Sequence, residues 1–90
     1  MYKVLLVDDE YMVTEGLKRL IPFEKWDMQV VATANHADDA LDYVKENPVD
    51  VVISDVNMPD KTGLEMIKEM KEILPDAAYI LLSGYQEFDY

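Results

Sequence analysis

Four short apolar runs alternate along the chain with longer segments of helical periodicity, and this alternation narrows the possible folds more than any other feature. The runs are rich in Val, Ile and Leu, and they lack the polar and apolar alternation of a half-exposed strand. They are Val4–Val7, Gln29–Ala32, Val51–Ile53 and Tyr79–Leu82. Such runs are typical of strands buried on both faces, so they predict a parallel sheet that is covered by helices.

The segments between the runs predict three helices, each with an apolar stripe. The stripes are Val13, Leu17, Leu20 and Ile21, closed by Pro22; Ala37, Ala40, Leu41 and Val44; and Met66, Ile67, Met70, Ile73 and Leu74, stopped by Pro75. Thr62 and Glu65 have the spacing of a capping box. Gly16 weakens the first helix by about 1 kcal/mol relative to Ala, and we expect close packing on the sheet to explain it.

The alternation of strands and helices predicts an α/β fold with right-handed crossovers. The chain has 90 residues, which is the size of one small domain. Residues 86–90 are expected to begin a fourth helix. Trp26 lies between the first helix and the second strand, so we expect it to pack at the edge of the sheet opposite the strands' carboxyl ends.

Charge and composition exclude several classes of function. The chain carries 8 Lys and Arg against 19 Asp and Glu, a net charge of −11, which phosphate groups of nucleic acids or anionic membranes would repel. The absence of cysteine excludes disulfides and thiolate chemistry, and a single histidine excludes a histidine-rich metal site. No apolar stretch approaches the roughly 20 residues that span a bilayer, so we expect a cytoplasmic protein without a membrane partner.

Polar residues follow the expected strands at the point where each strand ends. They are Asp8, Asp9 and Glu10 after the first, Asn35 and His36 after the second, Asp55 and Asn57 after the third, and Ser83 after the fourth. The carboxyl ends of parallel strands form the ligand-binding edge of such a sheet, so these groups are expected to converge there. Each feature alone has a simpler interpretation, because acids after a strand often cap a helix and Asp55 could be a turn residue.

Clustered carboxylates repel one another unless a cation lies among them. Mg²⁺ takes oxygen ligands and usually only one or two protein carboxylates, which Asp9 and Asp55 could supply together with a backbone carbonyl near Asn57. A carboxylate in such a site can also act as a nucleophile and form an acyl phosphate. The Ser83 hydroxyl could then donate a hydrogen bond to the phosphoryl group.

The same residues resemble, in order and spacing, the receiver domain of bacterial response regulators. The motifs are Asp8-Asp9-Glu10, Val51-Val52-Ile53-Ser54-Asp55-Val56-Asn57-Met58-Pro59, Gly63 and Leu82-Ser83-Gly84. The resemblance implies a flavodoxin-like, doubly wound parallel sheet of order 2-1-3-4-5. It also implies that residues 1–90 are one receiver domain, incomplete at its carboxyl terminus, with the fifth strand, the fifth helix and an essential lysine missing.

The resemblance further assigns roles to individual residues. It makes Asp55 the phosphoacceptor, Asp8 and Asp9 the acidic pair that holds Mg²⁺, and Asn57 a metal ligand through its backbone carbonyl. Ser83 is expected to be the switch hydroxyl. The side chains of Asn57 and Tyr85 are expected to face the phosphoryl group and to tune its lifetime.

The implied partner is a histidine kinase, which would carry the donor histidine, so His36 is interpreted as a loop or cap residue. Residues 20–26 and 83–90 resemble receivers that precede an AraC-type DNA-binding domain, so DNA would be bound only through an effector domain that is missing here. Without the fifth strand the fourth strand has an open edge, so residues 1–90 alone are expected to be either poorly folded or paired with another receiver copy. Two alternatives stay open: a Mg²⁺-dependent aspartyl-phosphate hydrolase, and a pseudo-receiver that only binds partners.

Overall fold

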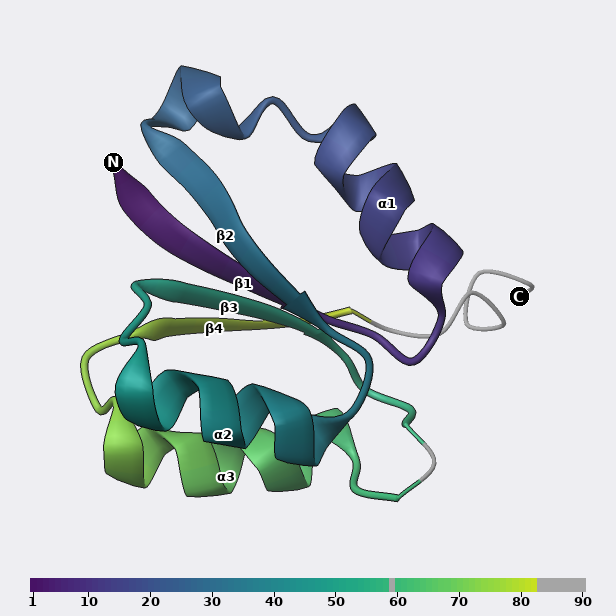
Figure 1. Cartoon of the computed structure of the whole chain (residues 1–90), viewed down its shortest axis with the longest axis vertical. Helices are drawn as coiled ribbons and strands as arrows, with labels where there is room; N and C mark the ends of the chain where they lie inside the picture. The colour runs from purple at the N-terminus through teal and green to yellow at the C-terminus, as the bar shows by residue number, and fades with distance from the viewer. Residues whose placement is uncertain (59, 83–90) are drawn as a thin grey trace.

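The computed structural model describes residues 1–58 and 60–82. Its strands are β1 (Tyr2–Val7), β2 (Met28–Ala34), β3 (Val51–Asp55) and β4 (Ala78–Leu82). Its helices are α1 (Tyr11–Leu20), α2 (Ala37–Glu46) and α3 (Gly63–Ile73), with a short 3-10 helix, η1 (Phe23–Trp26), before β2. The strands are parallel and lie in the order β2-β1-β3-β4, which confirms the predicted order 2-1-3-4 (Figure 1).

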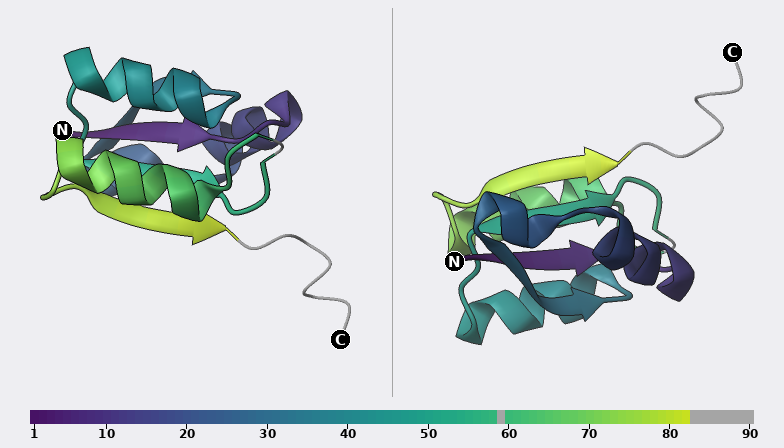
Figure 2. Two further views of the ribbon diagram at one scale, coloured as in Figure 1. Left: turned by 90° about the horizontal axis from the view of Figure 1, so that it is seen from below. Right: turned by 90° about the horizontal axis from the view of Figure 1, so that it is seen from above.

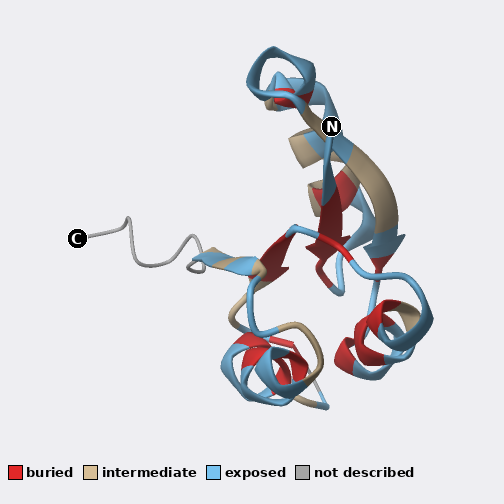
Figure 3. Ribbon diagram, turned by 90° about the vertical axis from the view of Figure 1, so that its left-hand side faces the viewer, coloured by how far each residue is buried: buried red, intermediate tan, exposed pale blue. Residues whose placement is uncertain are grey.

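The sheet lies between two helical layers, with α1 on one face and α2 and α3 on the other (Figure 2). Strand β1 runs through the centre and contributes to both cores. Leu5 and Val7 pack toward α2 and α3, while Val4 and Leu6 pack toward α1. Buried residues are concentrated along β1 and β3 and on the inner sides of α2 and α3 (Figure 3). Burial on both faces therefore explains the continuous apolar runs of β1 and β3, as the sequence predicted.

The two outer strands of the described sheet differ from that prediction. Strand β2 is only partly buried, and in β4 Ile80 is 46% and Leu81 36% exposed. Each of these strands has one neighbour among the described residues, so fewer side chains cover it. The prediction of burial on both faces is thus correct for β1 and β3 and wrong for β2 and β4.

Helix α1 meets the sheet on a face that differs slightly from the predicted stripe. Thr14 is the buried residue of this helix, whereas Leu20 is 81% exposed. Thr14 and Leu20 lie on opposite flanks of the line through Leu17, and the helix is turned so that the Thr14 flank faces inward. An added β-carbon at Gly16 would meet nothing within 4 Å, so the expected close packing there is also wrong.

Helices α2 and α3 confirm their predicted faces. Ala37, Ala40, Leu41 and Val44 of α2 are buried, as are Met66, Ile67 and Met70 of α3. The capping box of α3 is complete: the Glu65 N–H donates to the Thr62 hydroxyl at 3.2 Å, and the Thr62 N–H donates to the Glu65 carboxylate at 3.0 Å.

Trp26 is the last residue of η1, and the next residue, Asp27, accepts a hydrogen bond from the N–H of Tyr2 at the amino-terminal end of β1, so Trp26 lies at the predicted edge of the sheet. Its side chain is 58% exposed, so the expectation that it packs there is wrong. Within the described ranges, every helix is too short or too polar to cross a membrane. The expected helix at residues 86–90 lies outside the described residues.

Candidate functional site

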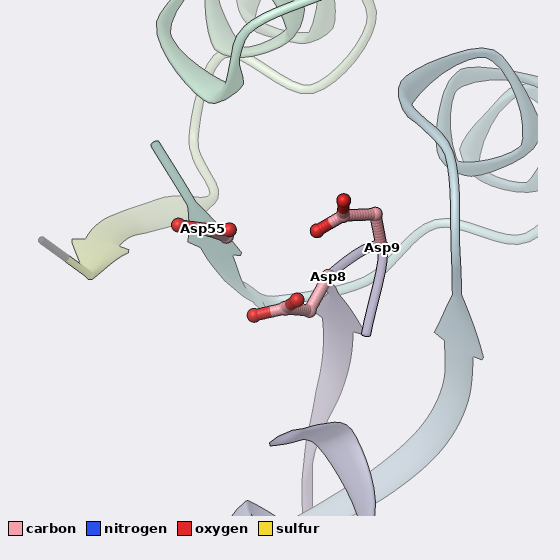
Figure 4. A group of neighbouring side chains, drawn as sticks. All are labelled: Asp8, Asp9 and Asp55. Atoms are coloured by element: carbon pink, nitrogen blue, oxygen red, sulfur yellow. The ribbon is translucent and has the colours of Figure 1, made fainter. Parts of the chain in front are cut away.

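Three aspartates converge at the carboxyl ends of the two central strands. Asp8 directly follows β1, Asp55 is the last residue of β3, and the two strands are neighbours whose register ends at the pair Val7–Ser54. One carboxylate oxygen from each of Asp8, Asp9 and Asp55 lies within 4.8 Å of the others. Figure 4 shows the Asp8 and Asp9 carboxylates directed to the side on which Asp55 lies. The sequence-predicted acidic cluster is therefore present.

Asp8 is the buried member of the cluster, with 5% of its surface exposed. Burial raises its pKa to about 6, and repulsion from Asp55 and Asp9 adds to the rise, while a hydrogen bond from the Glu10 N–H lowers the pKa in part. That N–H donates to Asp8 Oδ1 at 2.8 Å. At neutral pH the folded chain therefore holds a costly ionised carboxylate, and a bound cation would relieve that cost.

Asp9 and Asp55 offer more accessible oxygens. Asp9 is exposed, and Asp55 is partly buried. The N–H of Asn57 donates to Asp55 Oδ1 at 3.2 Å, which leaves Asp55 Oδ2 for another ligand. The cluster consists of carboxylates alone, a donor set that suits a hard divalent cation and disfavours zinc. The residues present fit a magnesium-type ion.

The backbone of Asp55 is held closely. The Ser54 hydroxyl, on a fully buried residue, donates to the Asp55 carbonyl at 2.9 Å. Gly63, at the start of α3, lies against the same carbonyl, and its N–H donates to the Val56 carbonyl at 2.9 Å. The Val56 N–H in turn donates to the Leu82 carbonyl at 3.2 Å. Ser54 is part of the quoted motif, but the sequence assigned it no role, because a small residue inside an apolar strand carries no distinctive pattern.

The simpler interpretation of the first acids as helix caps is not supported. Glu10 is the N-cap residue of α1, and its side chain makes no capping hydrogen bond. Glu10 and His36 are not members of the aspartate cluster. His36 occupies the N-cap position of α2, where its carbonyl accepts from the Ala40 N–H at 3.1 Å and its side chain makes no capping hydrogen bond; this position at the start of a helix agrees with its interpretation as a loop or cap residue. Ser83 and Tyr85 lie outside the described residues.

The sequence comparison assigns this arrangement to a family. Residues 4–90 match the response regulator receiver domain, and this match covers nearly the whole chain. The chain belongs to this family. Receiver domains are signalling domains of two-component systems, and the acidic group at Asp8, Asp9 and Asp55 could bind a metal.

Similar proteins include several regulators of Gram-positive bacteria. A response regulatory protein of Staphylococcus epidermidis is 36% identical over 90 residues, and the transcriptional regulatory protein YesN of Bacillus subtilis is also 36% identical. The transcriptional regulatory protein HptR of Staphylococcus aureus is 33% identical. The chain covers 35% of the first and third of these proteins and 24% of YesN, so it spans about a third of their length or less.

Solved structures support the same fold. The receiver domain of AraT from Geobacillus stearothermophilus is 38% identical, with a TM-score of 0.87 over 99% of this chain and 69% of that one. A two-component transcriptional regulator AraC from Clostridium phytofermentans is 28% identical, with a TM-score of 0.88 over 100% of this chain and 73% of that one. The chain therefore has the flavodoxin-like receiver fold, and its homologues include AraC-type regulators, as the sequence motifs predicted.

Proposed function

We propose that residues 1–90 act as one receiver domain whose phosphoacceptor is Asp55. The observation that supports this most strongly is the convergence of three carboxylates, from two adjacent strands, within 4.8 Å. Of the three, Asp55 combines a partly buried position with a carboxylate that its own loop orients through the Asn57 N–H. Asp8 is too buried to be the nucleophile, and Asp9 lies on the exposed side of the cluster.

The proposed reaction is phosphoryl transfer from a histidine of a partner kinase. A carboxylate oxygen of Asp55 attacks the phosphorus atom, the bond from phosphorus to the ring nitrogen breaks, and the electron pair returns to the imidazole. The product is an acyl phosphate on Asp55. The domain would otherwise have at most self-phosphorylation and self-dephosphorylation activity.

We propose that Mg²⁺ is the cofactor. Asp9 and Asp55 would ligate it directly, the Asn57 backbone carbonyl would provide a third protein oxygen, and Asp8 would complete the acidic pair. A bound Mg²⁺ would offset the negative charge of the phosphoryl oxygens. The raised pKa of Asp8 supports this assignment, because a bound cation would offset both of the effects that raise it, burial first and repulsion from Asp55 and Asp9 second.

Three further roles are proposed from the family resemblance. Ser83 would donate its hydroxyl to the phosphoryl group and act as the switch residue. The side chains of Asn57 and Tyr85 would face the phosphoryl group and influence its lifetime. Asn57 is exposed and lies beside the Asp55 carboxylate, which is consistent with such a role.

The proposed partners follow from the same function. A histidine kinase would supply the phosphoryl group, and the output would be transcriptional, through a DNA-binding effector domain outside these residues. We place the protein in the cytoplasm. A second receiver copy is a further proposed partner, since β4 exposes Ile80 and Leu81 at the outer side of the described sheet.

Intact mass spectrometry after incubation with acetyl phosphate and Mg²⁺ tests the proposed function. The test uses the intact receiver, in which the parent is expected to gain one phosphoryl group and Asp55→Asn is expected to gain none. Asp60→Asn is the matched control, because Asp60 is an exposed acid of the same loop. An unmodified parent protein would favour a pseudo-receiver, whereas labelling of Asp55→Asn equal to that of the parent would place the phosphoacceptor elsewhere.

A further inference from the structure

Ser54 carries a fully buried hydroxyl group one residue before Asp55. In the parallel register its strand neighbours are Val7 and Leu81, and Val52 precedes it on the same face of β3. A hydroxyl in such apolar surroundings is costly unless it makes a hydrogen bond. A small apolar residue would fill this space equally well. Packing therefore does not explain the hydroxyl, and its hydrogen bond must be considered.

The hydroxyl makes its hydrogen bond to the backbone of the proposed phosphoacceptor. Ser54 Oγ donates to the Asp55 carbonyl oxygen at 2.9 Å. The register between β1 and β3 ends at Val7–Ser54, so the Asp55 carbonyl lies one residue beyond the last paired position on that side. The Ser54 hydroxyl thus donates to the Asp55 carbonyl, which lies beyond the paired positions of β1 and β3.

The peptide unit that joins Asp55 to Val56 is consequently fixed at both of its polar atoms. Its carbonyl accepts from Ser54 and lies against Gly63, and its N–H donates to the Leu82 carbonyl at 3.2 Å. The Asp55 side chain leaves the same α-carbon as this peptide unit. Holding the peptide plane therefore fixes the direction of the Cα–Cβ bond from which the carboxylate extends.

We propose that Ser54 is a positioning residue, which holds the Asp55 carbonyl so that the carboxylate stays directed at Asp8 and Asp9. This inference rests on the proposed phosphoacceptor role of Asp55. The Ser54 hydroxyl is bonded to the Asp55 carbonyl, and Ser54 acts through this backbone contact alone. Loss of the hydroxyl leaves the fold intact and loosens the carboxylate.

Ser54→Ala in the intact protein removes the hydroxyl and little else. We expect Mg²⁺ affinity and the rate of phosphorylation by acetyl phosphate to fall about three- to tenfold, the range that corresponds to one ordinary hydrogen bond. The backbone carbonyl ¹³C resonance of Asp55 is expected to move, because it loses a donor. This resonance reports the contact independently of any activity.

Thr14→Val is the matched control. Thr14 is also a buried hydroxyl residue whose Oγ1 donates to a backbone carbonyl, that of Tyr11 at 2.8 Å, but it lies within α1. We expect this variant to lose a similar amount of stability while Mg²⁺ affinity, phosphorylation rate and the Asp55 resonance stay at the parent values. Equal losses in both variants would show a merely structural role and would overturn the proposal.

Two further outcomes separate this inference from the proposed function. A parent protein that is not phosphorylated at Asp55 contradicts the proposed function itself. A parent that is phosphorylated, together with Ser54→Ala that binds Mg²⁺ and reacts like the parent, overturns the positioning role alone, whether or not the Asp55 resonance moves.

Discussion

The carbonyl oxygen of Asp55 and the α-carbon of Gly63 approach so closely that a β-carbon on residue 63 would lie 2.2 Å from that oxygen. No real side chain tolerates such a contact. The same β-carbon would lie 3.0 Å from the Leu81 side chain. Glycine at this position therefore lets the start of α3 pack directly against the end of β3, where the acidic cluster lies.

Gly63→Ala is expected to destabilise the fold and to disturb the site. The backbone of Asp55 or the first turn of α3 must move, and overpacking of this kind typically costs about 1–3 kcal/mol. Urea unfolding measures the loss of stability, and Mg²⁺ titration measures the effect on the site. An Ala variant with the stability and Mg²⁺ affinity of the parent would contradict the close packing.

Gly16→Ala is expected to have the opposite effect. Gly16 lies within α1, and an added β-carbon there would meet nothing within 4 Å. Because alanine favours the helix over glycine, the free energy of unfolding should rise by up to about 1 kcal/mol. Thermal and urea unfolding measure it, and a loss of stability would show that α1 packs more tightly than described.

Asp8→Asn is expected to stabilise the metal-free protein in a pH-dependent manner. The pKa of Asp8 is raised from 3.8 to about 6, so the folded state binds its proton more tightly than the unfolded state does. Stability is therefore lost as the pH rises from about 4 to about 6, and the loss reaches about 2–3 kcal/mol above that range. Asparagine carries no charge and can still accept from the Glu10 N–H.

Urea unfolding in EDTA at several pH values measures this difference. Asp8→Asn should exceed the parent in stability at about pH 8, and the two should converge toward about pH 4. A stability difference that does not change with pH would contradict burial as the source of the raised pKa.

Asp9→Asn is expected to weaken Mg²⁺ binding with little effect on stability. Asp9 is exposed, so its contribution to the core is small, but its carboxylate belongs to the cluster. Calorimetric titration with Mg²⁺ measures the affinity. Glu10→Gln is the matched control, because the neighbouring Glu10 is outside the cluster; equal affinities of Asp9→Asn and the parent would exclude a metal at this place.

Much of the fold could be predicted because local pattern and tertiary role agree. Strands β1 and β3 are continuous apolar runs, and in the sheet formed by the described residues they are the two strands with neighbours on both sides. The capping box at Thr62 and Glu65 is a local sequence signal, and both of its hydrogen bonds are present in the structure. The convergence of Asp8, Asp9 and Asp55 followed from their places after adjacent parallel strands.

The errors concern properties that depend on orientation and on neighbours distant in sequence. The rotation of α1 about its axis decides whether Thr14 or Leu20 is buried, and the sequence stripe is compatible with both. The exposure of Trp26 depends on how η1 meets β2. The hydrogen bond from Ser54 to the Asp55 carbonyl depends on where the pairing with β1 ends, which no local pattern records.

The decisive measurement is to map which residue carries the phosphoryl group. After reaction with acetyl phosphate and Mg²⁺, borohydride reduces an acyl phosphate to the alcohol, so a modified aspartate becomes homoserine and can be located by peptide mass spectrometry. We expect homoserine at Asp55 and at no other acid. Homoserine at Asp8 or Asp9, or at an acid outside the cluster, with Asp55 unmodified, would contradict it.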